Sequence, residues 1–303
     1  MDGLPSWFIR LSAPILAKPL AHLFNLALND AFFPSQWRAA IITPIPKITN
    51  PINHSDFRPI SITPVLSRVL EKLVVGTYIY PALANPPSPL NFDDQYAFRP
   101  TGSTCSAIIH LLAVITEMLR NNSYVRVVAL DFSKAFDTVR HQTLATKLAC
   151  LKIPDNIYNW LISFLEDRMH CTKLSGVQSS FLSISASVIQ GSAMGPSAYA
   201  VMASDLHTIN RGNCLIKFAD DTYLLVPESL SNTCQAEISH IEQWSANNNL
   251  TLNRKKTFEI LFHSPHNAIK SRLPIDIPPA PSNVFRSFEY FPTLSAREVN
   301  KVK

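Results

Sequence analysis

Apolar residues recur every three or four positions in several segments of the chain, which is the spacing of amphipathic helices. They do so in residues 12–30, in the segment that follows Pro64, and in the segment that follows Ser103 and Thr104. Proline suits the first turn of a helix, and Ser or Thr caps its start. The same reasoning predicts further helices over residues 141–151, 156–167, 191–205 and 233–247.

Other apolar segments have the length and composition of β-strands. "YVRVVALD" reads as a buried strand that ends at Asp131, and residues 214–226 read as a hairpin with Ala219-Asp220-Asp221 at its tip. "WRAAIITPIPK" and "KKTFEILF" are predicted strands, and strand pairs are expected around residues 170–188. Strands interleaved with helices predict an α+β or α/β protein.

Length and composition are sufficient for a large hydrophobic core, but they do not indicate a specific function. The chain has 303 residues, of which 47% are hydrophobic, enough for one large domain or two small ones. A net charge of +5 fits a polyanionic partner, but many unrelated proteins share it.

The cysteines and the N-terminus bear on location. The five cysteines are scattered and form no C-x-x-C pair, so neither a disulfide framework nor a zinc knuckle is expected. No signal-peptide pattern and no apolar run of membrane-spanning length are apparent. We therefore expect an intracellular protein, in the nucleus or the cytoplasm, without membrane attachment.

Three aspartates are the main candidates for chemistry. Asp220 and Asp221 lie between apolar runs, where they are either turn residues or ligands of a divalent cation. Asp131 ends a buried strand, where it is either a helix cap or a ligand. If these strands are neighbours, Asp131 and Asp220 face one another and can hold two Mg²⁺ roughly 3.5–4 Å apart. Gly191 and Gly195 permit close backbone approach to a ligand, or form an ordinary turn.

The order of these motifs carries a resemblance to a known family. "ALDFSKAFDTV", "QGSAMGPSAYA", "FADDTYLL" and "LTLNRKKT" resemble the palm motifs of reverse transcriptases, in particular those of non-LTR (LINE-type) retrotransposons. "PSQWRAAIITPIPK", "DFRPISITPVLSRVLEKLV" and "QYAFRPTGSTCSAIIHLL" resemble the fingers of that family. The resemblance runs from about Leu4 to Leu261, and several ordered motifs are more specific than any one of them.

The resemblance implies a right-hand polymerase fold of the α+β class, with a small antiparallel sheet packed on helices. It implies fingers over about 1–121 and 141–187, and a palm over about 122–140 and 188–262. Residues 263–303 are expected to be a divergent primer-grip remnant and an irregular tail, with the thumb absent. The implied activity is RNA-directed DNA polymerisation with Mg²⁺ (Mn²⁺ possible), an RNA template, a DNA primer and dNTPs.

The resemblance also implies roles for individual residues. Asp131, Asp220 and Asp221 match the catalytic carboxylates, and the carbonyl of Phe132 matches a further metal ligand. Lys256 matches the lysine that protonates pyrophosphate. The implied dNTP-binding residues are Lys47, Arg58, Phe132, Phe136, Gln190 and Gly191, with Arg99 on the template strand. Solvated surface positions remain the alternative for the lysines and Arg58, and a core aromatic remains the alternative for the Phe136 gate.

Some positions depart from the family pattern. Ile189 stands where proline is usual, and Ala97 stands where glycine is usual. The primer-grip motif begins at Phe288-Glu289-Tyr290 and then diverges. We therefore expect the isolated chain to bind template–primer weakly, and an inactive or co-opted remnant that binds nucleic acid is the alternative function.

Other palm-type enzymes fit the sequence less well. A nucleotide cyclase lacks these fingers motifs, and a group II intron maturase matches them less closely than a LINE-type reverse transcriptase does.

Overall fold

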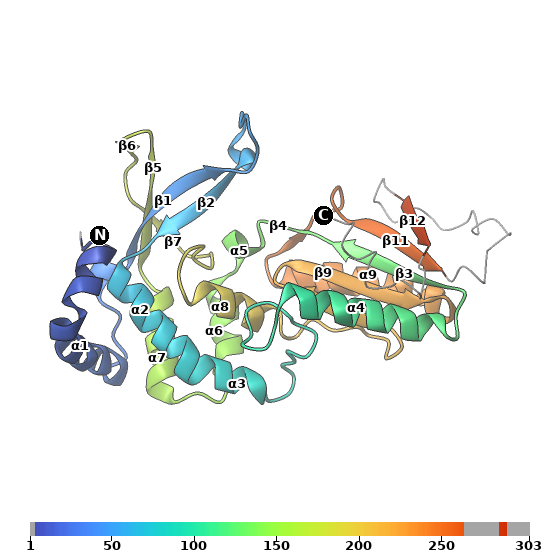
Figure 1. The fold of residues 1–303 in the computed structure, drawn as a ribbon, viewed down its shortest axis with the longest axis horizontal. Coiled ribbons are helices and arrows are strands. Elements are labelled where there is room, and N and C mark those ends of the chain that lie inside the picture. Colours follow the sequence, from blue (N-terminus) through green and yellow to red (C-terminus); the bar gives the residue numbers. More distant parts are fainter. Residues whose placement is uncertain (1–3, 264–284, 290–303) are drawn as a thin grey trace. The chain divides into compact units, whose positions relative to one another are not determined.

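The computed structural model describes residues 4–263 and 285–289, and these form two compact units (Figure 1). Unit 1 comprises residues 1–92 and 136–205, and unit 2 comprises residues 93–135 and 206–303. Each unit has its own sheet and its own helices.

Most helices of unit 1 have a proline directly before them or in their first turn. Pro64 and Pro154 are the residues before α2 and α7, and Pro196 lies in the first turn of α8. The predicted helix after Pro64 is confirmed, although a π-helical turn, Val75–Ile79, interrupts it. The helices are α1 (Ser6–Asn29), α2 (Val65–Val74), α3 (Tyr80–Ala84), α6 (His141–Ala149), α7 (Asp155–Leu165) and α8 (Gly195–Met202).

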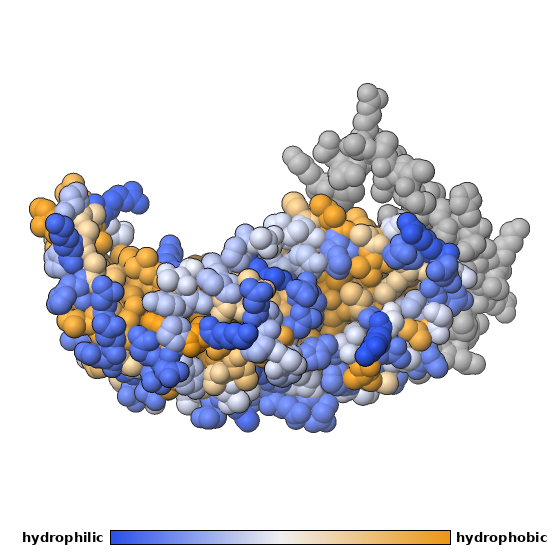
Figure 2. Space-filling view, turned by 90° about the horizontal axis from the view of Figure 1, so that it is seen from below, coloured by the Kyte–Doolittle hydropathy of each residue, from blue (hydrophilic) through white to orange (hydrophobic). Residues whose placement is uncertain are grey.

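The first helix bears on the expectation that no uninterrupted apolar run reaches membrane-spanning length. α1 has 24 residues and, among the described helices, is long and apolar enough to cross a membrane by length and composition only, although Arg10 and Lys18 interrupt its apolar run. Phe24 and Ala27 are nevertheless buried in unit 1, and the Phe24 ring lies 6.2 Å from that of Trp37. Figure 2 shows hydrophobic residues at the surface on the left, the side on which Figure 1 draws α1.

The sheet of unit 1 is built around a β-hairpin. β1 (Ala39–Pro46) and β2 (Phe57–Ile62) pair antiparallel, with Ile45 opposite Arg58. The other edge of β1 runs parallel to β5 (Arg168–Leu174), which also pairs with β6 (Val177–Gln178) and β7 (Leu182–Ile184). The strand order is β2-β1-β5-β6, with β7 on β5. The predicted strands before Lys47 and around 170–188 are therefore confirmed.

Unit 2 is a five-stranded sheet with helices packed on it. Its order is β12-β11-β3-β9-β8. The strands are β3 (Tyr124–Leu130), β8 (Cys214–Phe218), β9 (Asp221–Pro227), β11 (Phe258–His263) and β12 (Phe285–Glu289), and the helices are α4 (Thr104–Leu119) and α9 (Cys234–Asn247). Ser103 caps α4 by accepting from the backbone N–H of Ser106, as its position predicts. Ile115 of α4 joins the buried core of β3, β8 and β9.

The compact units divide the chain differently from the expected fingers and palm. Residues 93–121, part of the expected fingers, lie in unit 2, where α4 packs on β3, β8 and β9. Residues 188–205, part of the expected palm, lie in unit 1, where Lys147 of α6 pairs with Asp205 at 2.6 Å. Within the tail that was expected to be irregular, β12 forms a strand parallel to β11.

Candidate active site

The three aspartates lie at one end of the sheet in unit 2. β3 pairs antiparallel with β9 as far as Leu130 and Thr222, and Asp131 and Asp221 are the residues that adjoin this last pair. Asp220 occupies the turn between β8 and β9, whose last pair is Phe218 with Asp221. The predicted hairpin and its acidic tip are therefore present.

Burial and neighbouring negative charge disfavour ionisation of the two turn carboxylates, Asp220 and Asp221. Burial raises the pKa of Asp220, and the charges of Asp221 and Asp131 raise it further. Burial and the charge of Asp131 likewise raise the pKa of Asp221. Such mutual repulsion is relieved by a bound cation or by a proton. The arrangement therefore has the electrostatic character of a cation site.

The donor atoms fit a hard divalent cation. Mg²⁺ prefers oxygen ligands and is usually held by one or two carboxylates together with substrate phosphates. No set of three or more His, Cys, Asp or Glu side chains is gathered as a preformed metal site in the described part of the chain. A cation bound by the aspartates would therefore need further ligands, such as the oxygens of a substrate phosphate. Asp131, Asp220 and Asp221 could thus hold Mg²⁺.

The backbone of Phe132 can also contribute an oxygen. β4 (Phe132–Ser133) pairs antiparallel with β10 (Thr251–Leu252), with Phe132 opposite Leu252. Since the N–H of Asn253 donates to the carbonyl of Asp131, the alternation of the ladder makes Phe132 a non-hydrogen-bonded position. The Phe132 ring is buried 6.0 Å from Trp244. The β4–β10 ladder therefore leaves this carbonyl unused while the ring fixes the backbone.

The "LNRKKT" segment lies next to this end of the sheet. Asn253 hydrogen-bonds the backbone of Asp131 at 2.7 Å, and the N–H of Lys256 donates to the carbonyl of Asn253 at 3.0 Å. The Lys256 side chain is exposed. Arg99, the expected template residue, also belongs to unit 2, where its Nη1 donates to the carbonyl of Gln95 at 3.5 Å.

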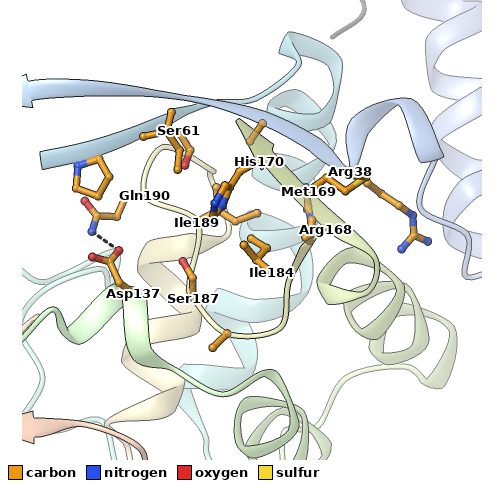
Figure 3. A pocket seen from close by; sticks show the side chains of 14 residues that line it. Arg38, Ser61, Asp137, Arg168, Met169, His170, Ile184, Ser187, Ile189 and Gln190 are labelled. Atoms are coloured by element: carbon orange, nitrogen blue, oxygen red, sulfur yellow. Dashed lines mark hydrogen bonds between the residues drawn. The ribbon is translucent and has the colours of Figure 1, made fainter. Parts of the chain in front are cut away.

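The remaining expected residues belong to unit 1. Gln190 is held at both ends: its carbonyl accepts from Ser61 N–H at 2.7 Å, and its Nε2 donates to Asp137 at 2.9 Å (Figure 3). Gly191 has a φ of +118°, and a Cβ there would stand 2.2 Å from the carbonyl oxygen of Ser61. Glycine is therefore required at 191 both for its backbone conformation and for close approach.

Gln190 lines a cavity of about 300 Å³ in unit 1 (Figure 3). Ala40, Ile42, Pro59 and Ser61 line the same cavity from β1 and β2. Side chains alternate between the two faces of a strand, so these residues belong to one face of the hairpin.

Lys47 and Arg58 lie on the other face of the hairpin. Arg58 is opposite Ile45, and Lys47 is two positions beyond Ile45, so both share its face. Both side chains are exposed, and Lys47 Nζ donates to the carbonyl of Ser55 at 2.9 Å. The hairpin thus presents two cations together, next to its turn.

Phe136 stacks on a buried aromatic ring. Its centroid is 4.5 Å from that of Tyr199, with 27° between the planes, and Tyr199 is 1% exposed. Phe136 itself is half-buried. A ring with one face packed and an edge accessible can act both as a core aromatic and as a steric gate.

Two buried polar residues escaped the sequence analysis. Glu71 of α2 accepts from the backbone N–H groups of Ala193 and Met194, which fixes the start of α8. Gln95 accepts from the backbone of the acidic turn in unit 2. A Ser67–Glu71 spacing of four on a helix was the only local signal for the first, and none existed for the second.

Comparison with solved structures supports a polymerase fold. A telomerase from Candida tropicalis, solved with a fragment of telomeric RNA, superposes with a TM-score of 0.55 at 14% identity over 81% of this chain and 44% of that one. An apo form of that telomerase, truncated from its C-terminal domain, gives 0.53 over 81% of this chain and 55% of that one, also at 14% identity. The fold is therefore that of fingers and palm, as the sequence predicted.

The family follows from sequence comparison. The family described as "Reverse transcriptase (RNA-dependent DNA polymerase)" matches residues 45–287, and the chain belongs to it. The RNA-directed DNA polymerase from mobile element jockey of Drosophila melanogaster is 30% identical over 273 residues, which are 86% of this chain and 29% of the relative.

Two further relatives place the chain among non-LTR elements. A probable RNA-directed DNA polymerase from transposon BS of Drosophila melanogaster is 30% identical over 86% of this chain and 29% of the relative. A Pol polyprotein from the type-1 retrotransposable element R2 of Popillia japonica is 26% identical over 78% of this chain and 34% of the relative. The chain is thus a reverse transcriptase domain of the non-LTR retrotransposon type, and it spans about 29% of the jockey and BS polymerases.

Proposed function

We propose that this domain catalyses RNA-directed DNA synthesis, adding a deoxynucleotide to the 3′-hydroxyl of a DNA primer on an RNA template and releasing pyrophosphate. The observation that carries the proposal is that Asp131, Asp220 and Asp221 lie at the same end of one sheet, where burial and neighbouring negative charge raise the pKa of Asp220 and Asp221. Carboxylates that resist ionisation without a cation are typical of a site built to receive one.

Asp131, Asp220, Asp221 and the carbonyl of Phe132 would hold Mg²⁺, or Mn²⁺ in its place. When bound, two such ions would lower the pKa of the primer hydroxyl and neutralise charge on the triphosphate.

The protein's own side chains have separate tasks in this proposal. Arg58 and Lys47 bind phosphate oxygens, since guanidinium makes bidentate contacts and ammonium acts as a point charge. Phe136 excludes a 2′-hydroxyl by steric clash. Lys256 gives a proton to the departing pyrophosphate. The remaining tasks are contact with the nascent base pair by Gln190 and Gly191, and with the template by Arg99.

The test is primer extension on an RNA template with dNTPs and Mg²⁺, using the wild type, Asp220→Asn and Glu117→Gln. Glu117 is a matched control because it is an exposed carboxylate of unit 2 whose partner is Arg120 on the same helix. We expect extension by the wild type and the control, and loss of extension in Asp220→Asn.

The assay is run on the chain itself and on a chimera that adds the following segment of a jockey-type polymerase. If neither extends a primer, yet both bind template–primer as well as their Asp220→Asn counterparts do, the domain is a nucleic-acid-binding remnant instead. Extension that survives Asp220→Asn would refute the carboxylate assignment.

A further inference from the structure

Part of the segment that precedes α4 runs beside β8 and is joined to it by a single β-bridge. Lys217 N–H donates to the carbonyl of Asp94 at 2.7 Å, and Tyr96 N–H donates to the carbonyl of Lys217 at 2.8 Å. Gln95 and Lys217 form a parallel bridge. The segment 94–96 therefore follows β8 toward the acidic turn that begins at Ala219.

A buried ion pair holds this segment to β8. Lys217 is 1% exposed, and its Nζ lies 3.0 Å from Asp94 Oδ2 and 2.9 Å from the carbonyl of Leu206. Gly102 closes the following loop, since a Cβ there would stand 2.0 Å from the carbonyl oxygen of Tyr96. The backbone around Gln95 is thus fixed on both sides.

The Gln95 side chain connects this segment to the acidic turn. Gln95 is 2% exposed, and its Oε1 accepts from Ala97 N–H and from Ala219 N–H, each at 3.0 Å. Ala219 has a φ of +58°, a left-handed conformation that is unfavourable for a residue with a Cβ. Ala219 directly precedes Asp220, so its conformation sets the direction of both turn carboxylates.

We propose that Gln95 is a positioning residue for the reaction: its amide oxygen holds Ala219 in the left-handed conformation and so aims Asp220 and Asp221 at the cation and the phosphate. This inference rests on the proposed function. The strain at Ala219 and the repulsion between the two carboxylates both disfavour this turn. The hydrogen bond that Gln95 accepts from Ala219 N–H stabilises the turn in spite of them. A displacement of about 1 Å at a reacting centre can cost on the order of a hundredfold in rate.

The variants separate positioning from stability. Gln95→Met keeps the length of the side chain and removes the acceptor, whereas Gln95→Glu keeps an acceptor oxygen. Asn213→Ala is the matched control, because Asn213 is a 6% exposed amide at the opposite end of β8, where it donates to Thr233 Oγ1 and Glu237 Oε1.

The first readout is hydrogen exchange, which needs neither metal nor substrate. The amide of Ala219, measured in peptides spanning 215–221, is expected to be protected in the wild type and Gln95→Glu, and to exchange at least tenfold faster in Gln95→Met. Asn213→Ala should retain the protection. If the Ala219 amide of the wild type exchanges as fast as an exposed loop, the inference is overturned even if Gln95→Met fails to fold. The inference is also overturned if Gln95→Glu loses as much protection of this amide as Gln95→Met.

The second readout is steady-state extension at varied Mg²⁺ and dNTP. We expect Gln95→Met to lower kcat about tenfold to a hundredfold. We expect its Mg²⁺ requirement to rise, its KM for dNTP to stay unchanged, and Gln95→Glu to recover part of kcat. If Asn213→Ala lowers kcat as much at an equal loss of melting temperature, Gln95 is only structural. Asp220→Asn is measured in parallel. Activity in that variant would refute the carboxylate assignment, and absence of extension by the wild type would refute the proposed function; neither outcome changes the exchange result.

Discussion

The backbone N–H of Asn253 donates to the carbonyl oxygen of Asp131 at 2.7 Å. This bond joins two motifs that are more than a hundred residues apart in the sequence, and it continues the pairing of β4 with β10. The turn from Asn253 to Lys256 is closed by its own bond, from Lys256 N–H to the carbonyl of Asn253. This geometry therefore anchors the turn that contains Lys256 to the backbone of Asp131.

The first prediction concerns the lysine in this turn. Lys256→Ala should lower kcat about a hundredfold, because a positioned general acid contributes on the order of 10²–10⁴. Lys255→Ala is the control, since Lys255 is the adjacent residue and is equally exposed. The measurement is single-turnover incorporation across pH. A loss in both variants alike would indicate general attraction of nucleic acid rather than proton transfer.

The second prediction concerns sugar choice. Replacing Phe136 with Val should admit rNTPs, because the ring edge that clashes with a 2′-hydroxyl is removed. Incorporation of dNTP and rNTP is compared in the wild type, Phe136→Val and Phe136→Tyr, the last of which keeps a ring able to stack on Tyr199. Unchanged discrimination in Phe136→Val would leave Phe136 as a core aromatic only.

The third prediction concerns stability without metal. A carboxyl whose pKa is raised by folding destabilises the folded state when ionised, and this penalty disappears as pH falls toward the unfolded value. The pKa of Asp220 is raised above 3.8, so Asp220→Asn should increase the melting temperature at pH 7 in a chelator. The difference from wild type should vanish below about pH 4.

Added Mg²⁺ should reverse this order. A ligand that binds only the folded state stabilises it by mass action, so wild type should gain stability with Mg²⁺ and Asp220→Asn should gain less. Glu117→Gln should follow wild type at every pH and metal concentration. If Asp220→Asn is destabilised in the chelator, the three carboxylates do not repel as described.

Local patterns predicted the elements of the fold well. The apolar spacing after Pro64 and Ser103 gave α2 and α4, and the apolar run to Asp131 gave β3. The positions of the carboxylates followed, because a strand end and a hairpin tip have distinctive sequences. Such features are set by residues close together in the chain, which a sequence displays directly.

Contacts between segments far apart in the chain were harder to predict from the sequence. The sequence suggested that Asp131 lies near the acidic turn, but the pairing of β3 with β9 that brings these strand ends together joins residues far apart in the chain. The parallel strand β12 and the hydrogen bond from Ala219 N–H to Gln95 also escaped prediction. A buried polar side chain that serves a distant backbone has no periodic signature, so it becomes visible only when both segments are in place.

The last prediction concerns Glu71, which supports the loop after Gln190. Glu71 is fully buried; its Oε1 accepts from Ser67 Oγ at 2.6 Å, and its Oε2 accepts from Ala193 N–H at 2.7 Å and Met194 N–H at 3.2 Å. Burial lowers the pKa of Arg168 to about 10, and the negative charge of Glu71 opposes this shift. Glu71→Ala would leave these donors without an acceptor and the buried guanidinium without a neighbouring anion.

Each buried donor left unpaired costs about 1–3 kcal/mol, so Glu71→Ala should reduce the free energy of unfolding by about 3 kcal/mol or more. Glu71→Gln keeps an oxygen for the two N–H groups and an amide for Ser67, and should lose less than half as much. Lys72→Ala, at the exposed neighbouring position, should change stability by under about 0.5 kcal/mol. Urea unfolding of the three variants measures these differences. A loss in Glu71→Ala no larger than that in Lys72→Ala would mean that α8 begins without help from α2.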